Sequence, residues 1–296
     1  MKLTFLGTAS MQPTRERNLS SIFFSHETEN ILIDCGEGTQ RQMKFHNLKP
    51  TKITRIIVSH FHADHVLGLG GFFRNLVAND YNKTLHVYIP KGTSKFLNNI
   101  MHSAYYGNDL DLKVHEFIKG VIFENEKFSV EAFPLVHTVS SYGFVFQEKP
   151  RRKINLAYTS KFGLTKHPLL GELQKGKDIT YEDKKISFKK ATLLVPGKKV
   201  GFILDTAVCN NCYKIGKDAD LLVSESTFSS EHKDKAKMYK HLTAGDAAMV
   251  AKKSNAKKLV LTHFSQRYKD DSVMLQEAKK IFKNTACAAD FMEVEV

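Results

Sequence analysis

The stretch Arg55-Ile-Ile-Val-Ser-His-Phe-His-Ala-Asp-His65 decides the fold and the chemistry of this chain of 296 residues. Its first four residues are mostly β-branched and apolar, which predicts a buried strand. Four potential metal ligands follow the strand within six positions: His60, His62, Asp64 and His65. A continuing strand would point His65 away from the other three, whereas a loop lets all four surround one small volume. Imidazole and carboxylate together suit zinc or a similar transition metal, and a histidine-rich surface loop is the less probable alternative.

The residues on either side of this stretch predict short strands with helices between them. In the first half, strands are expected at 2–6, 21–24, 30–34, 55–59 and 85–89. Helices are expected at 39–46, 66–77 and 93–105, and Gly107-Asn-Asp marks the end of the last one. In the second half, strands are expected at 130–134, 142–146, 199–204, 220–223, 258–262 and 291–296. Helices should occupy 272–283 and the residues after Thr243, which forms a weaker relative of the capping box with Asp246.

Three further polar residues stand directly after expected strands, namely His137, Asp205 and His263. Strand ends on one edge of a sheet are where α/β folds gather functional groups. With the first four ligands they are sufficient for two metal ions, and Asp205 is the natural bridge because each of its oxygens can hold one metal. Two metals polarise a phosphoryl oxygen and make hydroxide available near neutral pH. Asp34 also ends a strand and is expected to hydrogen-bond a ligand histidine, with a structural turn as the alternative.

Positive charge is concentrated in one segment of the chain. The net charge is +13, and residues 149–199 contain fourteen Lys and Arg against four Asp and Glu. Such an excess favours a polyanionic partner. The segment from about 148 to 190 is broken by Pro and Gly and has sparse apolar positions. We therefore expect an insertion that lacks a core of its own and projects from the body.

The rest of the composition limits the environment of the protein. No run approaches the ~18 apolar residues of a membrane span, and we see no signal peptide, so a cytoplasmic protein is expected. Four cysteines do not form a disulfide framework in a chain of this length. Cys209 and Cys212 have C-x-x-C spacing, but no second pair completes a four-thiolate zinc site. A redox motif would require a helix that opens at this position.

The sequence HFHADH with the strand before it resembles the metallo-β-lactamase superfamily, whose αβ/βα four-layer sandwich carries a dinuclear site on one edge. Across essentially the whole chain the resemblance is to the ribonuclease Z family, endonucleases that remove 3′ trailers from tRNA precursors. In the N-terminal part, FLGTAS, Pro13–Asn18 and Asp34–Arg41 are similar to motifs of that family. Further along the chain, its ligand motifs are matched by His137–Gly143, Leu204–Thr206 and Thr262–Tyr268. Arg15 stands where that family usually has Lys.

The resemblance implies an α/β domain over residues 1–296 that binds two zinc ions per subunit. One zinc would be held by His60, His62 and His137. The other would be held by Asp64, His65 and His263, with Asp205 bridging the two. The family also uses the aspartate of HxHxDH as the proposed proton acceptor, which gives Asp64 a second role.

Two short loops resemble family loops in which a glutamate-held histidine assists the departure of the leaving group. They are Ser224–Thr227 and His241–Thr243. The resemblance implies His241 as general acid and Glu225 as the residue that orients it, whereas the alternative makes His241 a surface residue that precedes a helix. Ser224 replaces the histidine that is usual in the family.

The basic insertion resembles the tRNA-clamping arm of the family, which usually reaches the substrate from the partner subunit of a homodimer. The Gly-Pro pair typical of that arm is replaced by His167-Pro168. Phosphate contacts by Lys and Arg would bind a folded RNA by shape, with little base specificity. The main hypothesis is therefore a zinc-dependent endoribonuclease that leaves a 3′-hydroxyl on tRNA. Alternatives are a related hydrolase of a small ester, thioester or phosphodiester, and an RNA-binding protein with an inactive site.

Overall fold

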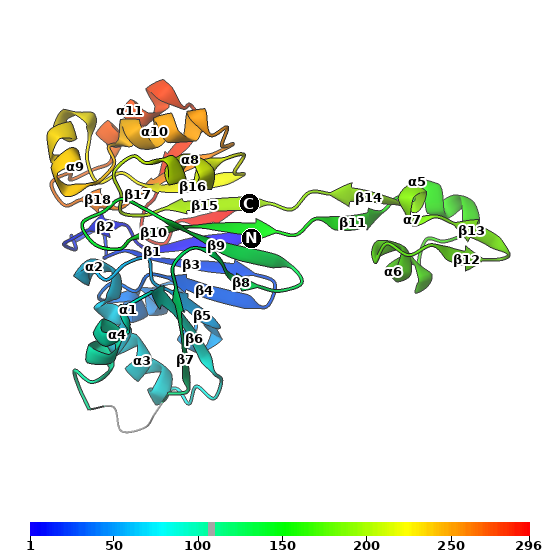
Figure 1. Ribbon diagram of the computed structural model, residues 1–296, viewed down its shortest axis with the longest axis horizontal. Helices are drawn as coiled ribbons and strands as arrows, with labels where there is room; N and C mark the ends of the chain where they lie inside the picture. Colours follow the sequence, from blue (N-terminus) through cyan, green and yellow to red (C-terminus); the bar gives the residue numbers. More distant parts are fainter. Residues whose placement is uncertain (106–109) are drawn as a thin grey trace. The chain divides into compact units, whose positions relative to one another are not determined.

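The computed structural model describes residues 1–105 and 110–296, which form two compact units (Figure 1). The first unit comprises Met1–Phe123, Val130–Phe146 and Lys199–Val296. The second comprises Glu124–Ser129 and Gln147–Lys198. The expected helix end at 107–109 lies outside the described residues.

One seven-stranded sheet of the first unit is built mainly from the N-terminal part of the chain. Its strands, in spatial order, are β20 (Glu293–Glu295), β1 (Lys2–Gly7), β3 (Ser21–His26), β4 (Glu29–Ile33), β5 (Arg55–Ile57), β6 (Leu85–Pro90) and β7 (Leu112–Phe117). The strands from β4 to β7 are parallel. One face is covered by α1 (Thr39–Phe45), α3 (Gly68–Ala78) and α4 (Ser94–Met101) (Figure 1). Phe72 of α3 is fully buried in this layer with Ile56 of β5.

The second seven-stranded sheet is built mainly from the C-terminal half. Its strands, in spatial order, are β19 (Thr285–Cys287), β17 (Leu259–Thr262), β16 (Leu221–Glu225), β15 (Lys199–Ile203), β10 (Tyr142–Glu148), β9 (Phe128–Pro134) and β8 (Gly120–Glu124). The first four of these strands are parallel. Its outer face is covered by α8 (Asn210–Gly216), α10 (Ala244–Lys253) and α11 (Ser272–Ile281) (Figure 1). Small residues let α10 approach closely, since Ala247 and Ala248 are fully buried in this layer with Leu222.

Aromatic side chains join the inner faces of the two sheets. The ring of Phe24 on β3 lies 4.3 Å from that of Phe146 on β10 and 6.5 Å from that of Phe202 on β15, measured between centroids. All three side chains are fully buried. The layers therefore run helix, sheet, sheet, helix, and the expected αβ/βα sandwich is confirmed.

The element boundaries differ from the expected ones near the central stretch. The strand β5 ends at Ile57 rather than at 59, and a separate short helix, α2 (Ala63–Val66), precedes α3. A small parallel pair, β2 (Ala9–Ser10) with β18 (Phe264–Ser265), was not predicted, because two-residue strands leave no periodic pattern. The capping box before α10 is confirmed, since Thr243 and Asp246 bond reciprocally.

The second unit has its own fold. It contains the pair β11 (Arg151–Ile154) with β14 (Thr192–Val195), the pair β12 (Ile179–Tyr181) with β13 (Lys184–Ile186), and the helices α5 (Leu156–Thr159), α6 (Leu169–Gln174) and α7 (Phe188–Ala191). Its hydrophobic core cluster contains the buried side chains of Leu164, Leu173, Ile179, Ile186 and Ala191. The expectation of a segment without a core is therefore wrong. These apolar positions are widely spaced in sequence, and elements of three to six residues are too short for a periodicity to show.

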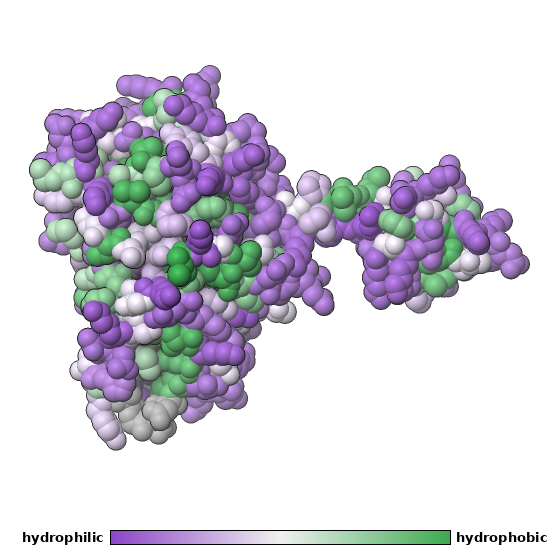
Figure 2. Space-filling model, in the orientation of Figure 1, coloured by the Kyte–Doolittle hydropathy of each residue, from purple (hydrophilic) through white to green (hydrophobic). Residues whose placement is uncertain are grey.

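The surface of the second unit is mostly hydrophilic on the face seen in Figure 2. An apolar exception is formed by Leu193 and Leu194 on β14 and by Leu156, which are each more than half exposed. The remaining described elements are α9 (Lys233–Tyr239) and the 3₁₀ turns Pro50–Lys52, Ser160–Phe162 and Ser230–His232. None of the helices in the described part of the chain has the length and apolar character needed to span a bilayer.

Candidate metal centre

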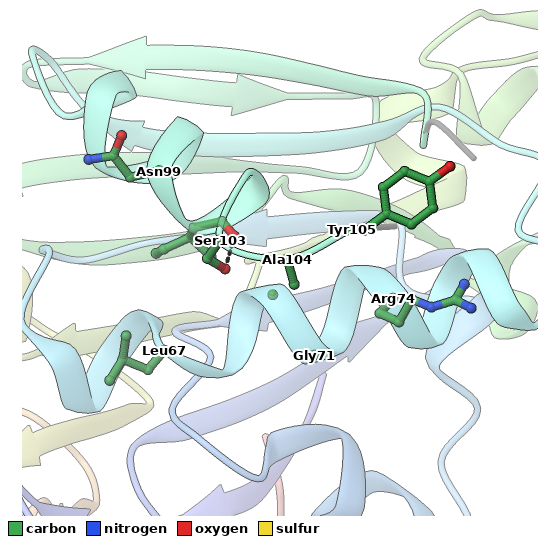
Figure 3. A pocket seen from close by; sticks show the side chains of 9 residues that line it. Leu67, Gly71, Arg74, Asn99, Ser103, Ala104 and Tyr105 are labelled. Carbon is green, nitrogen blue, oxygen red and sulfur yellow. Dashed lines mark hydrogen bonds between the residues drawn. The ribbon is translucent and has the colours of Figure 1, made fainter. Parts of the chain in front are cut away.

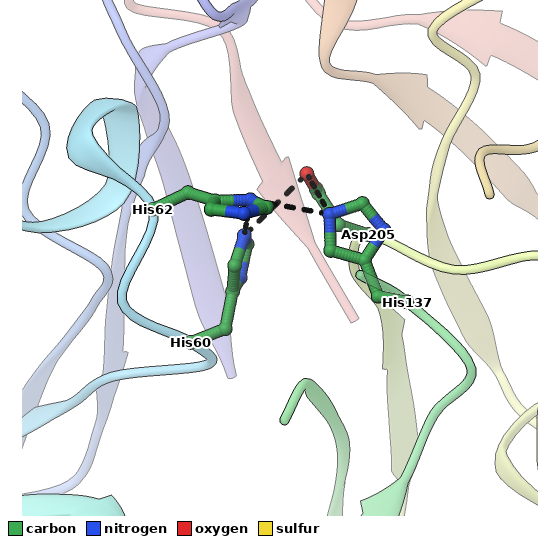
Figure 4. Close-up of side chains that lie close together, drawn as sticks. All are labelled: His60, His62, His137 and Asp205. Carbon is green, nitrogen blue, oxygen red and sulfur yellow. Dashed lines mark hydrogen bonds and ion pairs between the residues drawn. The ribbon is translucent and has the colours of Figure 1, made fainter. Parts of the chain in front are cut away.

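The predicted ligands converge at one edge of the first unit, where β5, β9, β15 and β17 end. Within each of two groups of side chains the donor atoms lie within 4.8 Å of one another, and a third such group combines Asp205, His241 and His263. The first group contains His60, His62, His137 and Asp205, and the second contains Asp64, His65 and His263. Figure 4 shows the first group, with three imidazole rings and one carboxylate pointing toward a common point.

The nitrogen atoms of the first group are spaced like the ligands of one small ion. His62 Nδ1 lies 3.1 Å from His60 Nε2 and 3.2 Å from His137 Nε2. Asp205 Oδ2 lies 3.6 Å from His60 Nε2 and 3.8 Å from His137 Nε2. Two nitrogens bound tetrahedrally to one zinc at about 2.0–2.1 Å are about 3.3 Å apart. The spacing of these donors therefore fits a transition metal.

The second group has the same spacing and shares Asp205 with the first. His65 Nε2 lies 3.3 Å from His263 Nε2, and Asp64 Oδ2 lies 3.5 Å and 3.4 Å from the same two atoms. Asp205 Oδ1 is 3.4 Å from His263 Nε2, while its Oδ2 is 3.6 Å from His65 Nε2. One carboxylate thus borders both groups.

The buried polar atoms at this edge fit a bound cation. Asp205 is 2% exposed, and its Oδ1 has no hydrogen-bond partner among the described residues. Buried carboxylate oxygens are normally paired, and an unpaired one carries a high desolvation cost. The ring nitrogens around it face one another at 3.1–3.3 Å, and a bound cation would satisfy them together. The residues present fit a metal-binding site.

The protonation states of most of these side chains also suit metal ligands. His65 is the exception, because burial alone would lower its pKa but the carboxylates of Asp64 and Asp205 raise it well above the usual value. Burial lowers the pKa of His60 well below its usual value, with a further contribution from His65, and burial likewise lowers the pKa of His62 and His137. Burial alone would raise the pKa of Asp205, but the surrounding histidines hold it well below its ordinary range. Neutral imidazole and ionised carboxylate are the forms that bind metals.

Several ligands are held in place by partners that lie further from the centre. Asp34 Oδ2 accepts a hydrogen bond from His65 Nδ1 at 2.7 Å, so the expected interaction of Asp34 with a ligand histidine is confirmed. His137 Nδ1 donates to the carbonyl of Lys240 at 3.0 Å, and the N–H of Met11 donates to Asp64 Oδ2 at 2.8 Å. Sequence reasoning missed Met11 and Lys240, because a backbone group gives no residue-type signal.

A second hydrogen-bonded cluster stands beside the ligands. His241 Nδ1 donates to Glu225 Oε1 at 3.0 Å, and it lies 3.9 Å from Asp205 Oδ2. Burial opposes the charged form of His241, but the carboxylate of Glu225 raises its pKa to about 9. Thr227 Oγ1 lies 2.7 Å from Glu225 Oε2, 3.2 Å from His241 Nδ1 and 3.0 Å from His263 Nδ1. The structure brings His241 and Glu225 to the site, and Thr227 was missed by sequence reasoning.

The metal centre opens into a cavity of about 600 Å³. Its lining includes the predicted site residues Asp64, His137 and His241, together with Phe228, Tyr239 and Arg267. The rings of Phe228 and Tyr239 are stacked, with centroids 6.4 Å apart and planes inclined at 18°. The guanidinium of Arg267 lies 5.3 Å from the Phe228 ring centroid. The cavity therefore combines the predicted metal ligands with aromatic side chains of the kind on which a nucleobase can stack.

A further hollow of about 560 Å³ lies between α3 and α4 (Figure 3). Leu67, Gly71, Arg74, Asn99 and Tyr105 are among its lining residues. None of the predicted site residues lines it.

Known proteins are similar to this chain in sequence and in fold. Residues 1–195 match the family model described as Anti-Pycsar protein Apyc1. Proteins named ribonuclease Z include one from Methanothermobacter thermautotrophicus, 37% identical over 100% of this chain and 97% of its own length. The ribonuclease Z of Protochlamydia amoebophila is 36% identical over 98% of this chain and 95% of its length.

Among solved structures, the short form of human tRNase Z superposes with a TM-score of 0.73 and 28% identity, covering 100% of this chain and 99% of the human one. The metallo-β-lactamase-fold protein YhfI from Bacillus subtilis has the same TM-score at 18% identity and covers 100% and 98% of the two chains. The second likeness shows the fold alone.

Proposed function

The chain belongs to the ribonuclease Z family and is a tRNA 3′-processing endoribonuclease, and we propose that it works with two zinc ions per subunit. Residues 1–195 also belong to the sequence family described as Anti-Pycsar protein Apyc1. The zinc proposal rests chiefly on one observation, the unpaired and buried Oδ1 of Asp205 among converging imidazole nitrogens.

The proposed ligand sets follow the two groups of donors. His60, His62 and His137 would hold one zinc, and Asp64, His65 and His263 would hold the other, with Asp205 between them. Zinc bound there polarises a phosphoryl group and lowers the pKa of a water molecule toward neutrality. The chain contributes ligands whose orientation is fixed by Asp34, by the Lys240 carbonyl and by the Met11 amide.

Two protein groups would move the protons of the reaction. Asp64 would accept the proton of the attacking water, because its carboxylate lines the cavity and is kept ionised by His65 and His263 against the effect of burial. His241 would give a proton to the leaving 3′-oxygen. Glu225 occupies its Nδ1, so the proton is delivered from Nε2. The tRNA product would then carry a 3′-hydroxyl.

The second unit would bind the tRNA. It is inserted between β10 and β15, and residues 149–199 carry fourteen basic against four acidic side chains. Most of the basic side chains lie at exposed positions. Their contacts with phosphates would supply affinity without reading base sequence. We extend the proposal to one metallo-β-lactamase-fold domain over residues 1–296 with this arm at about 148–190. We further propose a cytoplasmic homodimer in which the arm of one subunit holds the substrate of the other.

The proposal is tested with one precursor tRNA and the full-length protein. We expect a single cut at the 3′ side of the tRNA body, a 3′-hydroxyl product, and two zinc ions per subunit by elemental analysis. Light scattering or sedimentation should give the mass of a dimer. Scattered cleavage, or full activity in protein without a transition metal, would overturn the mechanism.

A further inference from the structure

The Cys209-x-x-Cys212 pair takes no part in the proposed reaction, yet the structure brings its two thiols together. The two Sγ atoms lie 3.6 Å apart. Cys209 is partly exposed and directly precedes α8, whereas Cys212 is fully buried in the first turn of that helix. The helix that a redox motif requires, which the sequence did not reveal, is therefore present.

The two thiols have different reactivity. Hydrogen bonds from the Cys212 thiol and from the backbone N–H groups of Cys212 and Asn211 outweigh burial and lower the pKa of Cys209 to about 5. The hydrogen bond to Cys209 and burial raise the pKa of Cys212 far above its usual value. An exposed thiolate beside a buried thiol is the arrangement of an attacking and a resolving cysteine.

The loop that carries the pair also carries Asp205, one of the proposed metal ligands. Cys209 is four residues from Asp205, and its Sγ lies 4.0 Å from Thr206 Oγ1. The N–H of Thr206 donates to Glu225 Oε1 at 2.8 Å, and its Oγ1 accepts from the N–H of Val136 at 3.0 Å. Thr206 thus connects the cysteine pair to the carboxylate that holds His241.

We propose that Cys209 and Cys212 form a thiol–disulfide exchange site for small-molecule disulfides, and that its oxidised state lowers the activity of the neighbouring centre. The effect on activity rests on the proposed function, whereas the exchange itself does not. In the first step, the Cys209 thiolate attacks one sulfur of a disulfide RSSR. A mixed disulfide forms, and RSH leaves after taking up a proton.

In the second step, Cys212 loses its proton to solvent and attacks the sulfur of Cys209. The Cys209–Cys212 bond forms, and the second RSH leaves. The protein loses two electrons and the proton of Cys212, and the small disulfide gains two electrons and two protons, of which the second comes from solvent. The sulfur atoms must close from 3.6 Å to about 2.05 Å. Cys212 is fixed in the core, so Cys209 and the loop attached to it move.

Exchange is measured on the reduced full-length protein in a Cys287→Ser background, which removes the other partly exposed thiol. The probe is glutathione disulfide, followed by alkylation and peptide mass spectrometry. We expect a disulfide between Cys209 and Cys212, a stable glutathione adduct on Cys209 in C212S, and unmodified Cys212 in C209S. Persistent glutathione on Cys209 of the parent protein, with Cys212 open to alkylation, would overturn the proposal.

The effect on activity is measured by comparing cleavage of precursor tRNA by the same sample before and after thiol–disulfide exchange. Displacement of a positioned group by about 1 Å can cost about a hundredfold in rate, so a fall of about tenfold or more is expected. Dithiothreitol should restore the rate, and the C209A/C212A double variant should keep the rate of the reduced protein in glutathione disulfide. An unchanged rate in fully oxidised protein, or an equal fall in the double variant, contradicts the proposed control.

Discussion

Asp205 is the residue on which the two ligand groups depend, because its carboxylate borders both of them. Oδ2 borders His60, His137 and His65, while Oδ1 borders His263 and has no hydrogen-bond donor among the described residues. A buried carboxylate of this kind is unfavourable until a cation arrives. Metal binding therefore gains free energy from neutralising the carboxylate charge of Asp205, which folding has already buried.

We expect Asp205→Asn to lose zinc and activity while keeping the fold. The amide preserves the shape of the side chain but removes the charge and one potential metal-binding oxygen. Loss of a residue that hydrogen-bonds a metal ligand lowers metal affinity or activity about 10–100-fold. Loss of the shared ligand itself should therefore reduce the cleavage rate by more than a hundredfold. Elemental analysis should find fewer than two zinc ions per subunit. The thermal midpoint of the metal-free protein serves as control, and a large fall in it would indicate misfolding instead.

Thr227→Val should slow the reaction without removing the metals. The hydroxyl of Thr227 lies between Glu225, His241 and His263, and valine keeps its volume while deleting that hydroxyl. We expect kcat on precursor tRNA to fall about 10–100-fold, because these side chains lose the group that orients them. Zinc content should stay at the wild-type level. Thr227→Ser is the matched control and should recover most of the rate; equal loss in both variants would assign the effect to packing.

Parallel strands explain why the ligands meet at one edge of the second sheet. β15, β16 and β17 are neighbours in register, with Ile203 opposite Ser224 and Glu225 opposite Thr262. Asp205, Glu225 and His263 consequently lie at adjacent strand ends. The sequence predicts this edge, because each ligand follows an apolar run. It does not predict Thr227 or the backbone partners, since their role comes from contacts between segments distant in sequence.

The helix α9 prepares the aromatic side of the cavity. It ends at Tyr239, and Lys240 follows in the left-handed region with φ 56°, which reverses the chain before His241. This turn places the carbonyl of Lys240 on His137 and leaves Tyr239 about half exposed at the cavity. One local reversal thereby supplies a ligand partner, an aromatic surface and the proposed acid.

Tyr239→Ala should weaken RNA binding and leave the chemistry of small substrates intact. Stacking of a base on an aromatic side chain is worth about 1–3 kcal/mol, which corresponds to a rise in KM for precursor tRNA of roughly 5- to 150-fold. The rate with bis(p-nitrophenyl) phosphate should change less than about twofold. Met238→Ala, on the same helix and 70% exposed, is the matched control. An equal rise in KM in both variants would exclude a stacking role for Tyr239.

At the scale of the whole molecule, the proposed catalytic residues and the excess of positive charge lie in different units of the chain. The metal centre lies entirely within the first unit, and the densest basic segment lies in the second. The position of the basic segment is evident from composition, but its small core is not. Five buried side chains spread over 28 residues hold the second unit together through pairings that no single window of sequence reveals.

Deletion of residues 150–188, closed by a short Gly-Ser linker, should raise KM for precursor tRNA at least tenfold. The zinc content and the rate of hydrolysis of bis(p-nitrophenyl) phosphate should stay near the wild-type values. A milder variant replaces four exposed lysines by glutamine: Lys184, Lys185, Lys189 and Lys190. Each lysine that contacts a phosphate contributes about 0.7–0.9 to the slope of log affinity against log salt concentration, so the slope should fall with every contact removed. Filter binding across a salt series measures the tRNA affinity and its dependence on salt concentration. Equal tRNA affinity and an equal slope in the parent and both variants would show that the second unit does not bind the substrate, while the metal centre would keep its assignment.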